Sequence, residues 1–112
     1  MAITFGAIGK QYVTFASDDA EEGQVCKMSA NGTVTVCEED DGFIGVVESI
    51  RGGFASVVLD GYVELPYSGT APDLGYAILA SDGDGKVAEA DEGRTCLVVS
   101  IDSTNHILGL FL

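Results

Sequence analysis

Residues 43–67 read FIGVVESIRGGFASVVLDGYVELPY, and this stretch predicts three consecutive β-strands. The segments FIGVVESI, FASVVL and YVELPY are rich in β-branched and aromatic residues, which favour strands over helices. The dipeptides Gly52-Gly53 and Asp60-Gly61 separate them and are typical of tight turns. The stretch therefore predicts strands that follow one another directly through short turns.

The rest of the chain continues this pattern. Segments of the same kind are YVTFA, GQVCKM and TVTV before the stretch, and YAILA, TCLVVSI and HILGLFL after it. No window shows a capped helical period, and residues 89–92 are expected to form at most one helical turn. Fifteen glycines lie mostly between these segments, where tight turns need them. We therefore expect an all-β fold, a compact small β-barrel or tulip-like sandwich.

Length and charge limit the classes of function. A chain of 112 residues forms one domain, and a hydrophobic share of 46% is too high for a disordered tail. Eighteen acidic residues oppose five basic ones, which gives a net charge of −13. Because such a surface repels phosphate backbones and anionic lipid, we expect no nucleic-acid partner and no membrane partner.

Targeting signals are not evident in the sequence. The opening MAITFGAIGK lacks a basic segment before an apolar core, and no apolar run reaches the length that spans a bilayer. We therefore expect neither a signal peptide nor a membrane helix, and synthesis in a cytoplasm.

Three cysteines, Cys26, Cys37 and Cys96, occur without the spacing of a zinc site. Disulfides are uncommon in a cytoplasm, so three reduced thiols are expected. A two-residue loop at Asn31-Gly32 would nevertheless place Cys26 opposite Cys37, close enough to bridge.

A three-residue loop of Ala30, Asn31 and Gly32, with positive φ at Gly32, gives the better register for this hairpin. This register places the apolar side chains on one face of the hairpin and the polar side chains on the other. The apolar face is Cys26, Met28, Val34 and Val36, and the polar face is Lys27, Ser29, Thr33 and Thr35. Cys26 and Cys37 then lie on opposite faces.

The two halves of the chain repeat one pattern at offsets of 51 to 53 residues, and the offset changes only in turns. The matching positions are Gly23 with Gly75, Ser29 with Ser81, Gly32 with Gly85, Val34 with Val87, Gly42 with Gly93, Val47 with Val98, Ser49 with Ser100, and Ile50 with Ile101. We therefore expect an N-terminal arm at residues 1–9, a first β-unit at 12–59 and a second at 64–112, all within one domain.

Residues 81–88, SDGDGKVA, raise the question of a calcium loop. Counted from Asp82, an EF-hand needs an oxygen ligand, a glycine and a glutamate where this chain has Lys86, Val87 and Gly93. Its counterpart SANGTV shares no carboxylate, so a hairpin turn explains both copies. A weak calcium site at Asp82 and Asp84 remains an alternative.

The acidic runs of the first half lie between predicted strands. Solvated loops are the simpler interpretation, and a divalent-ion site is the alternative. The runs are Asp18, Asp19, Glu21 and Glu22, and then Glu38 to Asp41. We assign no metal and no cofactor.

Catalysis is not expected. His106 is the single histidine, and no nucleophile elbow, zinc-protease motif or phosphate loop occurs. Cys96 and His106 are one conceivable thiol–base pair, but Cys96 lies in an apolar strand where a buried, inert thiol is usual.

The chain ends are the candidate contact surfaces. HILGLFL is almost continuously apolar, so as a strand it needs cover on both faces, and a neighbouring subunit can supply the second cover. The alternative, weighted equally, is that both ends complete the sheet of the monomer. The candidate contact residues are Ile3, Phe5, Ile8, Ile107, Leu108, Leu110 and Phe111.

The order of these segments resembles the bacteriophage capsid cement, or head decoration, proteins. The resemblance rests on VTFASDDAEEG and VELPYSGTAPDLG, each followed by an apolar strand and a hairpin, and on GFIGVVESI, the Gly-Gly turn and FASVVLDGYVEL. It covers the chain from about Gly6 onward.

This resemblance implies a structural protein on the outer face of a phage or prophage head. It implies a homotrimer that binds the major capsid protein, stabilises the expanded shell and is made in the cytoplasm of a bacterial host. The alternative is a non-catalytic binding module, carbohydrate-binding or tail-associated. Such a module would use a platform of Tyr12, Tyr62, Tyr67 and Tyr76, since the chain has no tryptophan.

Overall fold

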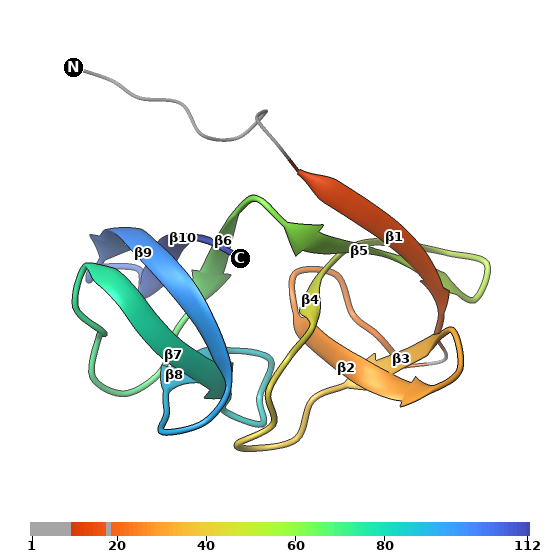
Figure 1. Ribbon diagram of the computed structural model, residues 1–112, viewed down its shortest axis with the longest axis horizontal. Helices are drawn as coiled ribbons and strands as arrows, with labels where there is room; N and C mark the ends of the chain where they lie inside the picture. Colours follow the sequence, from red (N-terminus) through yellow and green to blue (C-terminus); the bar gives the residue numbers. More distant parts are fainter. Residues whose placement is uncertain (1–9, 18) are drawn as a thin grey trace.

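The computed structural model describes residues 10–17 and 19–112, and the fold is all-β, as predicted (Figure 1). The strands are β1 Gln11–Ala16, β2 Val25–Ala30, β3 Thr33–Val36, β4 Gly45–Arg51, β5 Phe54–Asp60, β6 Tyr62–Pro66, β7 Gly75–Ser81, β8 Val87–Glu89, β9 Arg94–Asp102 and β10 Ile107–Phe111. Helices are absent from the described ranges, and residues 89–92, where at most one helical turn was expected, form none. Glu89 pairs with Leu79 in the sheet instead, and the Ala90 N–H continues the ladder by donating to the Ile78 carbonyl.

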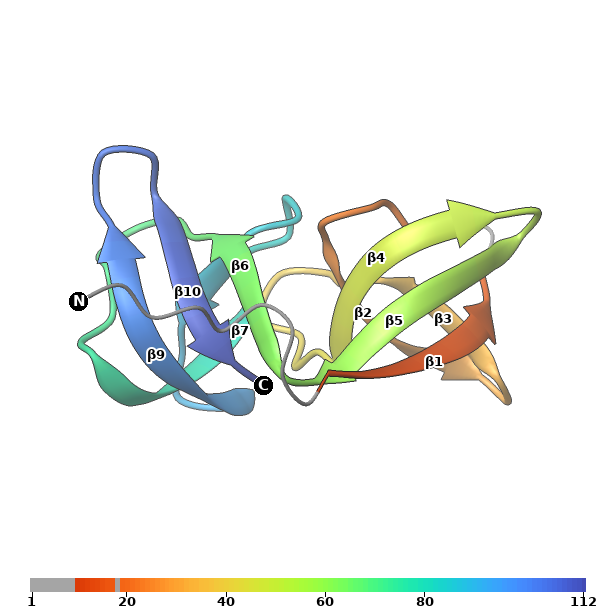
Figure 2. The same ribbon diagram turned by 90° about the horizontal axis from the view of Figure 1, so that it is seen from above.

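The described residues form ten strands, which make two five-stranded units with corresponding strand orders. The first unit is a closed barrel in the order β1-β3-β2-β4-β5, and the second is a sheet in the order β6-β10-β9-β7-β8. A parallel pair of Ala16 with Thr33 joins β1 to β3, and a parallel bridge of Tyr67 with Val87 brings the end of β6 to β8. Figure 2 shows the units side by side, with the chain passing from one to the other between β5 and β6.

Local irregularities recur at matching positions in the two units. The register of β4 against β5 shifts between Val47 and Ser49, and that of β9 against β10 shifts between Val98 and Ser100. Each shift is a β-bulge with one extra residue, Glu48 or Val99, and 51 residues separate these two in the sequence.

The turns of the β4–β5 and β9–β10 hairpins also make corresponding hydrogen bonds. The Ser17 N–H donates to the Gly53 carbonyl over 3.0 Å, and the Tyr67 N–H donates to the His106 carbonyl over 3.0 Å. Gly53 has a φ of 82° and His106 has a φ of 56°. His106 therefore occupies a left-handed turn position that a glycine fills in the first unit.

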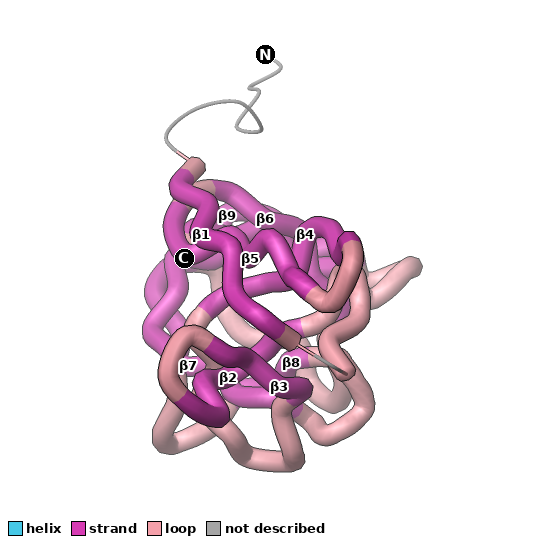
Figure 3. Tube along the Cα trace, turned by 90° about the vertical axis from the view of Figure 1, so that its right-hand side faces the viewer, coloured by secondary structure: helices cyan, strands magenta, loops and turns pink. Residues whose placement is uncertain are grey.

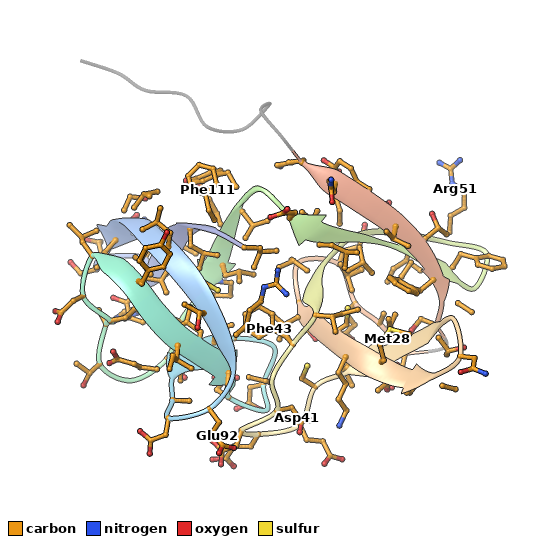
Figure 4. The ribbon with its side chains drawn as sticks, in the orientation of Figure 1. Met28, Asp41, Phe43, Arg51, Glu92 and Phe111 are labelled. Carbon is orange, nitrogen blue, oxygen red and sulfur yellow. The ribbon has the colours of Figure 1, made fainter. Side chains whose placement is uncertain are left out.

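The β2–β3 hairpin has the predicted register. Cys26 pairs with Val36 and Met28 pairs with Val34, and Gly32 has a positive φ of 65°. Met28 departs from the predicted apolar face, because its side chain is 43% exposed. Figure 4 labels Met28 on the β2–β3 hairpin of the first unit.

The core consists of two clusters. Cys26, Val34 and Val47 pack with Ala55 and Val57 inside the first barrel. The larger cluster joins the interior of the second unit to the outer face of the first. Its buried members are Val25, Cys37, Phe43, Val46, Val58, Val63, Leu65, Tyr67, Ala77, Leu79, Val87, Cys96, Val98, Leu108 and Leu110. The first unit is therefore covered on both faces where it meets the second.

Polar contacts also connect the units. The Arg94 guanidinium of β9 donates to the Ile44 carbonyl over 3.0 Å and to the Leu59 carbonyl over 2.8 Å. The Asp40 N–H donates to the Ser81 carbonyl, and the Ser81 N–H donates to the Asp41 carbonyl. Viewed along the long axis, the first unit lies directly in front of the second (Figure 3).

Candidate interaction surfaces

The C-terminal strand β10 contains four of the predicted contact residues. Leu108 and Leu110 are fully buried in the larger core cluster, so they are core residues of this chain and not surface contacts. Ile107 and Phe111 are half-buried on the other face of the strand. The remaining three candidates, Ile3, Phe5 and Ile8, lie outside the described residues.

The outer face of β10 receives cover from its own chain. A Cβ placed on Gly109 would come within 2.4 Å of the Tyr62 hydroxyl and 2.3 Å of the Ser100 Oγ, so these side chains close over the glycine. The Tyr62 ring meets the Phe111 ring edge-on at 5.5 Å. Cover on the second face of this strand, predicted from its apolar run, therefore comes in part from Tyr62 and Ser100.

An apolar row crosses the outer face of the second unit. Tyr62 pairs with Phe111, Phe111 pairs with Leu97, and Leu97 pairs with Tyr76, so the row runs from β6 through β10 and β9 to β7. Figure 4 labels Phe111 on this face. The row ends at Tyr76, whose side chain is 79% exposed, and the nearby Leu74 is 65% exposed.

A second apolar surface lies at the far end of the first unit. Phe54 and Ile50 are exposed at the β4–β5 turn and line a groove of about 550 Å³. Thr14, Ser49 and Ser56 also line this groove, and Arg51 projects beside it (Figure 4). Aromatic and aliphatic side chains are thus exposed at both ends of the molecule.

The acidic loop between β3 and β4 is held by an ion pair. The Lys27 Nζ lies 2.6 Å from the Asp41 Oδ2, which also accepts the Glu38 N–H over 2.8 Å. These hydrogen bonds lower the pKa of Asp41, with that from Lys27 contributing most. Asp41 therefore orders its own loop.

The SDGDGK loop is a hairpin turn closed by its first aspartate. The Asp82 Oδ1 accepts the N–H groups of Asp84 and Lys86 over 2.8 and 3.1 Å. Burial acts to raise the pKa of this carboxyl, but these hydrogen bonds and one from Ser68 outweigh it, so the pKa is lowered. Within residues 10–17 and 19–112, no three acidic, cysteine or histidine side chains gather as metal ligands.

The three thiols are buried, and the one histidine packs against an aromatic ring. Cys26, Cys37 and Cys96 are free thiols and are buried. Burial raises the pKa of Cys96 to about 11. The His106 ring packs edge-on against the Tyr67 ring at 5.4 Å. Cys96 lies near the start of β9 and His106 at the turn beyond its end, about 20 Å apart along an extended strand, so they do not form a catalytic pair.

The four tyrosines do not form one platform. Tyr67 is buried in the core, and Tyr12 lies on β1 of the first unit. Tyr62 and Tyr76 share the outer row of the second unit but are separated by two strands, about 14 Å at the usual strand spacing. No two of these tyrosines therefore lie side by side where they could stack on one sugar ring.

Two features of these surfaces were missed by sequence reasoning. Tyr76 and Ile78 point outward from β7 while Ala77 and Leu79 point inward, but all four are apolar or aromatic, so no alternation marks the exposed face. Arg94 follows the repeated glycine Gly93, and nothing in the sequence marks it as the contact between units.

A scan against models of known protein families finds no match, and a search of curated protein sequences finds none either. In the part of the chain that the structure describes, no helix is long and apolar enough to cross a membrane.

Proposed function

We propose that this protein is a structural cement on the outer surface of a phage or prophage head, acting there as a homotrimer. The observation that carries the proposal is the contrast between an occupied interior and exposed apolar ends. The three thiols are buried and the exposed His106 packs edge-on against Tyr67, whereas Phe54 and Tyr76 project from opposite units. Such a molecule joins neighbours by several surfaces at once.

Multivalent binding is the mechanism of stabilisation. A decoration subunit that contacts more than one capsid subunit favours the assembled, expanded shell, because it binds that state and not the separated subunits. The shared core of the two units supports this role, since it fixes the distance between their exposed surfaces.

The charge of the protein favours the outer face of the shell. With a net charge of −13, the protein would be repelled by packaged DNA, and the outside of the head imposes no such penalty.

Purified protein mixed with expanded heads and, separately, with unexpanded procapsids tests the proposal. We expect saturable, stoichiometric binding to expanded heads alone, and increased resistance of these heads to heat or chelation. Equal binding to both particles, or to neither, would contradict a cement function.

Removal of residues 1–9 tests the predicted role of the arm in the same assay. We expect weaker binding to expanded heads with an unchanged unfolding transition. Unchanged affinity would exclude the arm from the mechanism.

A further inference from the structure

The outer row of the second unit has a counterpart in the first unit, strand for strand. Each residue pairs with the next across neighbouring strands in both rows. The first row is Tyr12, Val58, Val46 and Val25, and the second is Tyr62, Phe111, Leu97 and Tyr76. The rows therefore occupy equivalent positions on two similar sheets.

These equivalent rows differ in exposure, most of all at the positions of Val25 and Tyr76. Val25, Val46 and Val58 are buried, because the second unit of the same chain packs on them. Tyr76, which pairs with Leu97 as Val25 pairs with Val46, is 79% exposed, and Leu97 is half-buried. In the first unit this surface is buried against the second unit. In the second unit the equivalent surface is exposed at its Leu97–Tyr76 end.

The residue that packs on these valines from the second unit, Val63, also has an equivalent in the first unit, and that equivalent is exposed. Val63 of β6 belongs to the same core cluster as Val46 and Val58 and lines one groove with them between the units. Val63 pairs with Leu110 in the second unit, as Val13 pairs with Val57 in the first. Val63 is 7% exposed, whereas Val13 is 40% exposed.

We propose that copies of this chain associate head to tail through these two open surfaces. The β1 strand of one copy, around Val13, covers the Leu97–Tyr76 end of the outer row of the next copy. The contact repeats between chains the packing that joins the two units within a chain. This proposal deepens the proposed function, because it assigns the surface through which the trimer forms, but it concerns the isolated protein.

Such a contact is heterologous, since it joins two different surfaces. Heterologous contacts form closed rings when the rotation between copies closes, and open filaments when it does not. A ring of three chains would alternate internal and intermolecular versions of one contact around its circumference. A twofold dimer, in which Tyr76 faces Tyr76, is the competing arrangement.

Disulfide trapping distinguishes these arrangements. The variants Val13→Cys and Leu97→Cys are prepared separately, mixed under mild oxidation and compared with each variant alone. Val13 and Leu97 correspond to Val63 and Val46, which line the same internal groove. We expect a linked dimer in the mixture and little in either single sample. The three native thiols are buried, so they contribute little background.

Equilibrium sedimentation of single substitutions supplies the second measurement. We expect Tyr76→Ser and Val13→Ser each to raise the concentration for half-association at least tenfold. Phe54→Ser is the matched control, because it removes an exposed aromatic side chain from the far end of the first unit and should leave association unchanged.

Three outcomes would overturn the inference: a monomeric native protein at high concentration, cross-linking of Leu97→Cys with itself alone, or equal effects of Phe54→Ser and Tyr76→Ser. None of these measurements uses phage heads. Head-to-tail trimers that fail to bind heads would therefore contradict the proposed function and leave this inference standing.

Discussion

Burial keeps the three thiols of this protein protonated. Burial raises the pKa of Cys26 to about 12, with a further contribution from Cys37, and raises that of Cys37 to about 11. Since the thiolate is the reactive form, we expect no alkylation of the folded protein by iodoacetamide near pH 8. Three labels should appear after unfolding in urea, as counted by mass spectrometry. Rapid labelling of the native protein would contradict the buried positions.

The same shifts make stability depend on pH at the alkaline end. A thiol with a raised pKa in the folded state keeps its proton at a pH where the unfolded chain has lost it. The stability that the protonated thiols contribute is therefore fully present below the ordinary thiol pKa of 9.0, and it is lost as the pH rises through the folded-state values of about 11 to about 12.

Individual residues differ in how far the sequence reveals their role. Gly32 was predictable, because an Asn-Gly turn and one apolar face together fix the hairpin register. Met28 was not, because its pattern matches a buried face while its side chain is 43% exposed. In the sequence, His106 is a conceivable partner base for Cys96. Only its positive φ and its contact with Tyr67 show that it is a turn residue.

At the scale of strands, the sequence predicted nine of the ten elements, because β-branched runs between glycines are a local signal. The three-residue strand β8 was absent from those segments, since Val87–Glu89 alone is too short to show a pattern. The parallel pairing of β1 with β3 and the open row ending at Tyr76 were also inaccessible, because both depend on contacts between distant segments.

Arg94 of β9 connects the two units, and we expect the loss of its hydrogen bonds to lower the free energy of unfolding measurably. Its guanidinium donates to two carbonyls of the first unit, and the single ammonium of a lysine cannot reproduce this fork. Arg94→Lys should lower the free energy of unfolding by about 1–3 kcal/mol, measured by urea denaturation. Arg51→Lys, at an exposed position of β4, is the control and should change it by less than about 0.5 kcal/mol. Equal effects would show that the Arg94 hydrogen bonds contribute nothing to stability.

At the scale of the whole molecule, association must overcome electrostatic repulsion. Each copy carries a net charge of −13, and the residues named at the proposed contact, Val13, Leu97 and Tyr76, are apolar or aromatic. Salt screens the repulsion between copies, with a Debye length of about 10 Å at 0.1 M and about 3 Å at 1 M, and leaves apolar burial in place. We therefore expect the concentration for half-association to fall as sodium chloride rises across this range.

Equilibrium sedimentation at several salt concentrations measures this dependence, and Tyr76→Ser serves as its control. The variant keeps the same net charge, so it should show a salt response of the same sign from a weaker starting affinity. Association that weakens with added salt would require ion pairs across the interface. Salt weakens attraction between unlike charges as well as repulsion between like charges. Weaker association at high salt would therefore contradict apolar contact as the force that holds the copies together.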